Sequence, residues 1–344
     1  MTGRTSRMLL LGGVLSILLV LFGWILFSPV VTGDEQTRHA VEIQRGLSFD
    51  RIMQLLRIED IIQHDFKPRF VARVLGLRSK LKAGRYELEG GLSSYRLLRK
   101  LVAGEVTNIT VTIPEGLQSR QIAALLAKEV GLDSASFVAL VNDVEFTSQL
   151  GVQATSLEGF LFPNTYRLPF GITPQRVIRL LVHEFHRQFN DSLRSRALQG
   201  KYSLLELVTL ASIIEGEAVI DSERPIISAV YRNRLRRGMR LQADPTIQYI
   251  VNDGPRRLLK KDLAIDSPYN TYKYSGLPPG PINNPGLASL MASFNPAKVG
   301  YLYFVANGDG SHTFSKTLTE HLRAKAKFDR YRRDVSRAKR GKKR

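Results

Sequence analysis

The chain has 344 residues, of which 43% are hydrophobic, and it contains no cysteine. This length allows more than one folded unit, and the lack of cysteine excludes disulfides and thiolate metal sites. Residues 321–344 hold twelve Lys or Arg and two Asp, so this C-terminal segment contributes +10 of the net charge of +19. Because no zinc knuckle or RNA-binding motif accompanies the charge, we expect no nucleic-acid partner.

The N-terminal segment predicts where in the cell the protein is located. Residues 8–31 form a 24-residue apolar run without a charge, and a bilayer needs about 20 such residues. Arg4 and Arg7 precede the run, whereas Asp34 and Glu35 follow it. The positive-inside rule therefore predicts a cytoplasmic tip at 1–7, with everything after the run outside the inner membrane. Because no small-residue cleavage site follows, we predict an uncleaved single-pass anchor, with a cleaved signal peptide as the alternative.

Residues 36–112 are expected to form short strands that alternate with short helices. The spacing Ile-x-x-Gly-Leu followed by apolar helical positions begins at Ile43 and again at Ile113, and a looser copy begins at Gly91. In each copy a strand enters a glycine turn and an apolar-periodic helix follows. This unit resembles the LysM module, a small carbohydrate-binding fold, although any short strand–helix unit can show the same spacing.

Residues 113–330 are predicted to form a second, mixed α+β domain. Helices are expected at 118–130, 134–141 and 173–189. Residues 265–286 contain five Pro and three Gly, which excludes regular structure, and so long a loop in a compact domain is usually functional. A hairpin is expected at 301–315, followed by a basic helix and a basic tail at 331–344.

The middle of this domain holds the most informative helix. Ser203 and Glu206 form a capping box, which marks a helix start. The helix that follows is apolar on almost every face and should be buried. It ends in Glu215, a carboxylate whose pKa should rise because of desolvation and the helix dipole, so that it could donate a proton near neutral pH. A buried ion pair with a downstream arginine is an equally good interpretation.

No partner carboxylate is evident for Glu215. Glu217 lies roughly opposite on the same helix, so these two carboxylates should not flank one bond. Glu223 and Asp244 lie on other elements. A second helix is expected to begin at Asp221 or Ser222 and to end at Gly238, and residues 239–248 look extended.

Several segments match a known family. They are 211–217 (ASIIEGE), 222–225 (SERP), 230–246 (VYRNRLRRGMRLQADPT), 269–272 (YNTY), 276–282 (GLPPGPI) and 301–306 (YLYFVA). Together they strongly resemble the endolytic murein transglycosylases, or YceG-like proteins, and the resemblance covers about residues 38–330. Gly216 departs from the pattern, because relatives carry Lys there, and it is expected to loosen the helix end. The basic tail is also outside the pattern.

The resemblance implies a membrane-anchored lytic transglycosylase that cleaves the β-1,4 bond between N-acetylmuramic acid and N-acetylglucosamine within nascent peptidoglycan. The product is a 1,6-anhydro end, which terminates elongation, and no metal or cofactor is implied. Glu215 falls on the family's catalytic position. It would protonate the leaving oxygen and then accept the proton of the attacking C6 hydroxyl, so that neither water nor a second carboxylate is needed. Peptidoglycan synthases are the implied protein partners.

Further polar residues are candidates for substrate binding. They are Glu217, Asn233, Gln242, Asp244, Thr246 and Tyr272. The alternative for Asp244–Thr246 is a structural turn, and for Asn233 a position on a helix surface. Two other functions stay open, namely a non-catalytic peptidoglycan-binding scaffold and a muramidase-type hydrolase. The basic tail suits anionic lipid or wall polymers on electrostatic grounds.

Overall fold

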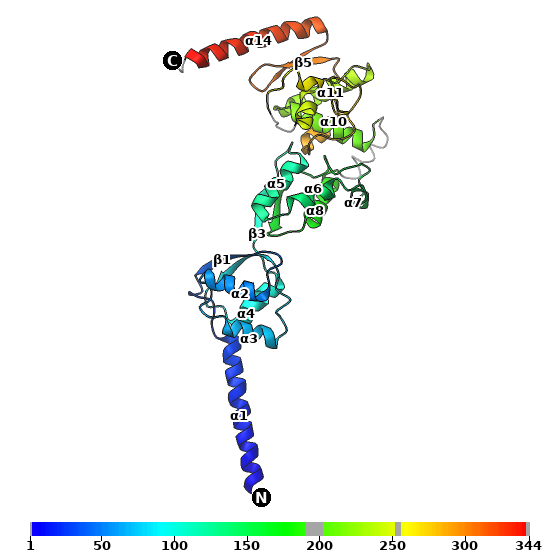
Figure 1. The fold of residues 1–344 in the computed structure, drawn as a ribbon. Helices are drawn as coiled ribbons and strands as arrows, with labels where there is room; N and C mark the ends of the chain where they lie inside the picture. Colours follow the sequence, from blue (N-terminus) through cyan, green and yellow to red (C-terminus); the bar gives the residue numbers. More distant parts are fainter. Residues whose placement is uncertain (1, 190–201, 252–255, 342–344) are drawn as a thin grey trace. The chain divides into compact units, whose positions relative to one another are not determined.

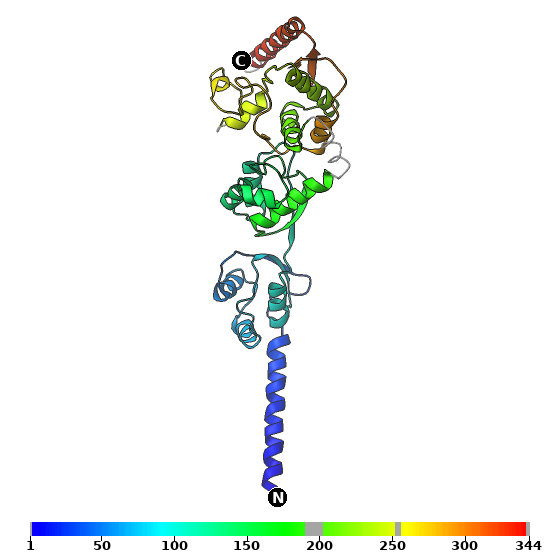
Figure 2. The same ribbon diagram turned by 90° about the vertical axis from the view of Figure 1, so that its right-hand side faces the viewer.

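The structure, a computed structural model, describes residues 2–189, 202–251 and 256–341. It has the mixed α+β fold that the sequence predicts. The chain separates into an N-terminal unit (residues 1–111, 128–132 and 167–172) and a C-terminal unit (residues 112–127, 133–166 and 173–344). Figures 1 and 2 show the course of the chain through each unit in two views.

The chain begins with helix α1 (Thr2–Phe27), drawn in blue in Figure 1. The large apolar side chains of α1 between Val14 and Leu21 are each at least half exposed. Across the described residues, no helix combines the length and the apolar character that a membrane crossing requires. The predicted anchor at 8–31 stays a prediction, and the first residue of the predicted cytoplasmic tip lies outside the described residues.

The N-terminal unit packs three helices with a two-stranded sheet. Strand β1 (Arg38–Ile43) pairs antiparallel with β2 (Gly84–Glu89), from Arg38 opposite Glu89 to Ile43 opposite Gly84. Alternate side chains of both strands, including Val41 and Tyr86, enter a core with α2 (Phe49–Ile58), α3 (Phe66–Val74) and α4 (Ser94–Ala103). This alternation is what a half-buried strand requires.

The sequence repeat corresponds to a repeated turn. Gly46, Gly91 and Gly116 have φ values of 82°, 75° and 77°, a left-handed conformation that glycine adopts without steric cost. In the first two copies a serine follows two residues later and caps the next helix through its side chain: Ser48 for α2 and Ser93 for α4. The repeat is therefore a glycine turn leading into a helix, and the likeness to LysM stays a prediction.

Strands β3 (Asn108–Thr112) and β4 (Thr165–Pro169) form a second two-stranded sheet. The helices α5 (Ser119–Val130), α6 (Ser134–Val141) and α8 (Pro174–Gln188) confirm the three that the periodicity predicts. A short helix, α7 (Val144–Gln149), follows α6.

Helix α10 (Leu204–Glu217) is central to the C-terminal unit. Its predicted capping box between Ser203 and Glu206 is present, and every residue from Leu207 to Ile214 is buried. It contacts α11 (Arg224–Arg236), which follows the 3-10 turn η1 (Asp221–Glu223), and α13 (Leu287–Phe294). Figure 1 shows α10 and α11 in yellow-green. Burial on all sides explains why this helix lacks a polar face.

The predicted extended conformation of residues 239–248 is wrong for its second half. Helix α12 (Asp244–Ile250) begins there, with Pro245 in its first turn. Proline favours this position because its fixed φ suits a helix and its missing N–H has no intrahelical acceptor in the first turn. The interpretation of Asp244–Thr246 as a simple turn is likewise wrong. Residues 265–286, which follow the 3-10 turn η2 (Asp262–Ala264), contain no helix or strand, as predicted.

The last elements follow the prediction. Strands β5 (Tyr303–Ala306) and β6 (His312–Ser315) form the expected antiparallel hairpin. Thr317 and Glu320 form a second capping box, in which the Thr317 hydroxyl accepts from the Glu320 backbone N–H and the Glu320 carboxylate accepts from the Thr317 backbone N–H. Helix α14 (Leu318–Gly341) includes most of the predicted basic tail, and residues 342–344 lie outside the described residues.

A buried carboxylate joins three segments of the C-terminal unit. Glu158 accepts hydrogen bonds from the Ser119 backbone N–H at 3.1 Å, the Ser119 hydroxyl at 2.7 Å and the Asn284 side-chain amide at 2.8 Å. The Asn284 carbonyl oxygen in turn accepts from the backbone N–H groups of Gly159 and Leu161. Burial raises the pKa of Glu158 to about 7. This network holds the start of α5 against the loop before α13.

Candidate active site

The two glutamates at the end of α10 have different surroundings, and Glu215 is held in an ion pair. Its Oε1 accepts from Nη1 of Arg224 at 3.1 Å, and its Oε2 accepts from the backbone N–H of Gly286 at 3.0 Å. The side chains of Glu215 and Arg224 are only 7% and 8% exposed. Arg224 also binds Ser289 and Asp221. The structure therefore shows the ion pair that the sequence left open as an alternative to a free acid.

A second carboxylate, Glu115, lies beside this pair. Its own burial and the negative charge of Glu215 raise the pKa of Glu115, and Arg224 acts in the opposite direction. A Cβ atom at Gly286 would lie 1.9 Å from Cδ of Glu115, so glycine is what permits this approach. Glu115 was not among the site residues predicted from the sequence, although it directly precedes the repeated glycine at position 116.

Glu217 occupies a different environment. Its Oε1 accepts from the Tyr231 hydroxyl at 3.0 Å. Desolvation raises the pKa of Glu217 to about 7, the hydrogen bond from Tyr231 opposes this rise, and the nearby charge of Asp244 adds to it. A carboxyl group with this pKa is partly protonated at neutral pH, which is what a general acid requires.

Glu217 and Asp244 together line two cavities of the C-terminal unit. The first, which we call the amide-lined cavity, has a volume of about 500 Å³ and includes the side chains of Gln118, Gln121, Gln248 and Asn283. The second, the cation-lined cavity, has a volume of about 450 Å³ and includes Arg234, His321, Lys325, Tyr272, Phe304 and Phe328. The two carboxylates thus lie where both cavities meet.

The sequence left open how far Asp244 lies from the end of α10, and in the structure its charge acts on Glu217. Asp244 stands at the start of α12 and Glu217 at the end of α10, and the two elements meet at Gly216 and Pro245. A Cβ atom at Gly216 would lie 2.6 Å from Cβ of Pro245, so the missing side chain permits the contact. The expectation that Gly216 loosens the helix end is wrong, because α10 continues through it to Glu217.

The other predicted site residues fall into two groups. The Tyr272 hydroxyl donates to Oδ1 of Asp244 at 2.5 Å, and both Tyr272 and Gln242 line the cation-lined cavity. Asn233 instead donates to the backbone carbonyls of Val299 and Tyr301 at 2.9 and 2.8 Å. It is buried, so the alternative of a helix-surface position is also wrong.

Thr246 is likewise buried, and its hydroxyl bonds the Ala243 carbonyl and the Thr271 hydroxyl. Asn233 and Thr246 line neither cavity, and their hydrogen bonds serve the fold.

Asn283 is a site residue that the sequence analysis missed. Its side-chain NH₂ donates to the Ser212 carbonyl at 2.9 Å, which fixes the orientation of the amide. Its Oδ1 is buried and has no hydrogen-bond partner among the described residues. A buried acceptor without a partner costs about 1–3 kcal/mol. Because Asn283 lines the amide-lined cavity, a bound ligand is a suitable partner. The composition of residues 265–286 indicated function but did not single out this position.

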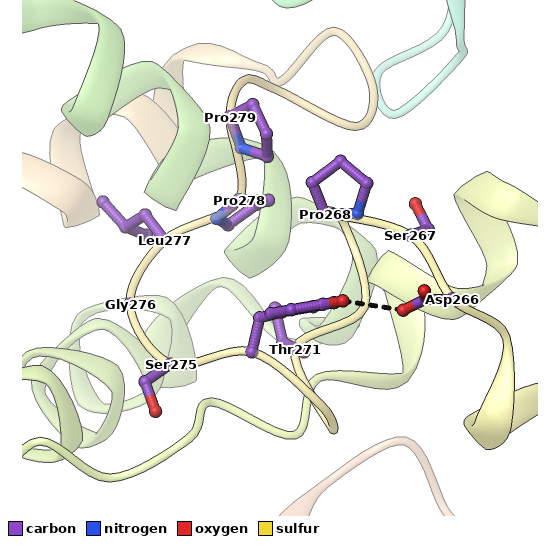
Figure 3. Close-up of a pocket in the computed structure, with 10 residues that line it drawn as sticks. Asp266, Ser267, Pro268, Thr271, Ser275, Gly276, Leu277, Pro278 and Pro279 are labelled. Carbon is purple, nitrogen blue, oxygen red and sulfur yellow. Dashed lines mark hydrogen bonds between the residues drawn. The ribbon is translucent and has the colours of Figure 1, made fainter.

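A third cavity, of about 430 Å³, lies within the proline-rich loop (Figure 3). Pro268, Gly276, Pro278 and Pro279 line it, and the Tyr274 hydroxyl donates to Asp266 at its edge. Neither Glu217 nor Asp244 lines this cavity. Among the described residues, no group of three or more His, Asp and Glu side chains could hold a metal ion.

A protonatable glutamate beside a second carboxylate, in a cleft with neutral amides, is typical of enzymes that cleave glycosidic bonds. The model of the YceG-like family matches residues 41–327, and the chain belongs to this family.

The chain is similar to proteins with assigned names. It is 36% identical over 326 residues to an endolytic murein transglycosylase of Bacillus subtilis, a match that covers 90% of this chain and 89% of that protein. It is 31% identical to an endolytic murein transglycosylase of Streptococcus pneumoniae, covering 83% of this chain but only 58% of the longer relative. A crystal structure of a YceG-like protein from Listeria monocytogenes matches with a TM-score of 0.58 and 33% identity, over 83% of this chain and 99% of that one.

The ion pair generates a stability prediction. Arg224→Met leaves Glu215 buried without its cation, which should lower the free energy of unfolding by about 3–5 kcal/mol, measured by urea denaturation. Arg237→Ala, at the exposed residue directly after this helix, is the control and should change the free energy of unfolding by less than about 0.5 kcal/mol. Glu215→Gln in the Arg224→Met background should restore part of the loss. Equal midpoints for Arg224→Met and the control would show that the pair does not stabilise this helix end.

Proposed function

We propose that this protein is a membrane-anchored lytic transglycosylase that cleaves the bond between N-acetylmuramic acid and N-acetylglucosamine within peptidoglycan strands and leaves 1,6-anhydro ends. Membership of the YceG-like family and the names of its relatives support this function. The observation that carries the proposal is the placement of Glu217, a carboxyl group with a pKa raised to about 7, where two polar cavities meet.

Glu217 is a better proton donor than Glu215, the residue that the family resemblance suggests. A general acid must be protonated near neutral pH and must reach the bond that it cleaves. Glu217 lines both cavities, whereas Glu215 lines neither and accepts hydrogen bonds from Arg224 and from the Gly286 backbone. We therefore assign proton transfer to Glu217. Glu215 acts as a positioning residue that fixes the end of α10 to α11 and to the loop before α13.

The reaction needs one carboxyl group that acts twice. Glu217 donates its proton to O4 of the leaving N-acetylglucosamine while the bond from that oxygen to the muramyl C1 breaks. The muramyl C6 hydroxyl attacks C1, and Glu217, now a carboxylate, accepts its proton. One bond from C1 to oxygen replaces another, so no water is consumed and Glu217 returns to its initial state. The charge of Asp244, oriented by Tyr272, stabilises positive charge that develops at C1.

One observation favours the alternative of a muramidase-type hydrolase. Asp244 lies beside Glu217 and could be the second carboxylate that hydrolysis uses in most families. In such a hydrolase a water molecule would attack C1 instead of the C6 hydroxyl. Mass spectrometry of digested strands separates the two reactions, since transglycosylase products are lighter than hydrolase products by one water. The scaffold alternative predicts no cleavage by the native protein.

The two glutamates can be separated by isosteric substitution. Glu217→Gln should lower the release of anhydro ends by about 10²–10⁴-fold, the usual contribution of a general acid. The Glu215→Gln variant should keep most of the activity at a temperature where the variant is folded, because the side chain of residue 215 lines neither cavity. Circular dichroism provides the folding control for both variants. Loss of activity in Glu215→Gln with full activity in Glu217→Gln would reverse the assignment.

The pH profile provides a second test. Because the free enzyme must have Glu217 protonated, kcat/KM should fall about tenfold per pH unit above pH about 7. The Tyr231 hydroxyl stabilises the carboxylate form of Glu217. Tyr231→Phe should therefore raise the pKa of Glu217 and shift the fall in kcat/KM to higher pH. Tyr166→Phe, which removes a buried hydroxyl that donates to the Phe162 carbonyl, is the matched control. If kcat/KM of Tyr231→Phe fell at the same pH as in the native protein, Glu217 would be excluded as the titrating group.

The anchor is residues 8–31, with the catalytic domain outside the inner membrane and beside the peptidoglycan synthases. Support comes from the uncharged apolar run and from the exposure of its side chains between Val14 and Leu21. Since the chain has no cysteine, single introduced cysteines report topology cleanly. A membrane-impermeant maleimide should label Gln36→Cys in intact spheroplasts and Thr5→Cys only after permeabilisation. The reverse pattern, or a protein without residues 1–31 that still fractionates with membranes, would contradict the anchor.

A further inference from the structure

The cation-lined cavity differs in charge from the amide-lined cavity on the other side of Glu217. Arg234 from α11 and His321 and Lys325 from α14 contribute to its lining. Glu217 and Asp244 are its acidic residues, and both line the amide-lined cavity as well. The amide-lined cavity has one basic side chain, Arg120, and a third acid, Glu115. Basic side chains are therefore more numerous in the cation-lined cavity, and acids are more numerous in the amide-lined cavity.

None of these three basic side chains forms a direct ion pair with an acidic side chain among the described residues, although the charge of Arg234 acts on Glu217 from a distance and lowers its pKa. Arg234 uses Nε and Nη1 to donate to the backbone carbonyls of Leu302 and Leu241, at 2.6 and 2.7 Å. Lys325 makes no ion pair within the described part of the chain. Nδ1 of His321 is buried without a hydrogen-bond partner, while its ring stacks on Tyr303 with the centroids 5.2 Å apart.

Other charged groups around the cavity are already satisfied. His312 is bonded to Glu223 at 2.7 Å, and Asp244 accepts from the Tyr272 hydroxyl. Burial and the positive charges of Lys325 and Arg234 lower the pKa of His321, as expected where positive charge is not compensated. The wall formed by Arg234, His321 and Lys325 therefore offers donors that no acidic side chain pairs with directly, and the two acids lie where this cavity adjoins the amide-lined one. An unpaired basic wall of this kind suits an anionic ligand.

We infer that the cation-lined cavity binds a carboxylate of the stem peptide carried by the muramyl residue, and that Lys325 of α14 contacts it. This inference rests on the proposed function. In peptidoglycan a peptide is attached to the muramyl sugar through its lactyl group, and this peptide has free carboxylates. N-acetylglucosamine bears no charge. The cavity adjoins Glu217, so the charged substituent closest to the cleaved bond is this peptide.

The two cavities then fix the direction of the strand. Neutral amides in the amide-lined cavity suit the hydroxyl and acetamido groups of the leaving N-acetylglucosamine side. The cation-lined cavity suits the muramyl side, whose C1 must face Glu217. Helix α14 is thus part of the substrate site, and the enzyme prefers strands that still carry their peptides.

The test compares strands whose stem peptides keep their free carboxylates with the same strands after these carboxylates have been amidated. Lys325→Ala should raise KM for the strands with free carboxylates about fivefold, the effect of one exposed charge pair, and should raise KM for the amidated strands less. Lys325→Glu should raise KM further. Lys327→Ala, an exposed lysine two residues on that does not line the cavity, is the control and should match the native protein.

A binding measurement separates this inference from the proposed function. By calorimetry, the native protein should bind a muramyl tripeptide with free carboxylates about fivefold more tightly than its amidated form, and Lys325→Ala should bind both equally. Equal binding of both forms by the native protein, or an equal effect of Lys325→Ala on strands with free and with amidated carboxylates, would overturn the inference. If the native protein releases no anhydro ends from either substrate, the proposed function fails, whatever the calorimetry shows.

Discussion

The geometry of the cleft depends on the buried ion pair between Glu215 and Arg224. Residues 215 and 217 project in different directions from the last turn of α10, so anchoring one side chain determines where the other can lie. Arg224 and the Gly286 backbone hold Glu215, and Glu217 is thereby turned toward Tyr231 and the two cavities. A buried pair contributes little net stability but is costly to break, which suits a role in fixing an orientation.

The approach of α10 and α12 is the second constraint, and it has a steric origin. Only a residue without a side chain at position 216 allows Pro245 to pack against the helix end. That contact brings Asp244, the residue before Pro245, close to Glu217. The negative charge of Asp244 and the desolvation of Glu217 then act together on one carboxyl group. The chemistry of the site thus follows from packing between two helix ends.

Local signals in the sequence predicted most of the secondary structure. The predicted capping box at Ser203 and Glu206, the glycine turns, the β5–β6 hairpin and the irregular loop at 265–286 are present, because each depends on residues close together in the chain. Helix α12 was missed because a proline after an aspartate is typical both of turns and of a helix start. Glu115 and Asn283 could not be placed, because their neighbours in the site lie far away in the sequence. The family motif located the end of α10, but choosing between its two glutamates required knowing what surrounds each one.

The buried carboxyl of Glu158 couples folding to proton uptake. Its pKa rises from 4.5 to about 7 in the folded protein, so between these values the folded state retains a proton that the unfolded chain has released. The stability that this proton confers is fully present below pH 4.5 and is lost as the pH rises through about 7. Because Glu158 joins the start of α5 to the loop before α13, the segment that becomes less stable is a wall of the amide-lined cavity. The amide-lined cavity is therefore expected to bind the sugar most tightly at mildly acidic pH.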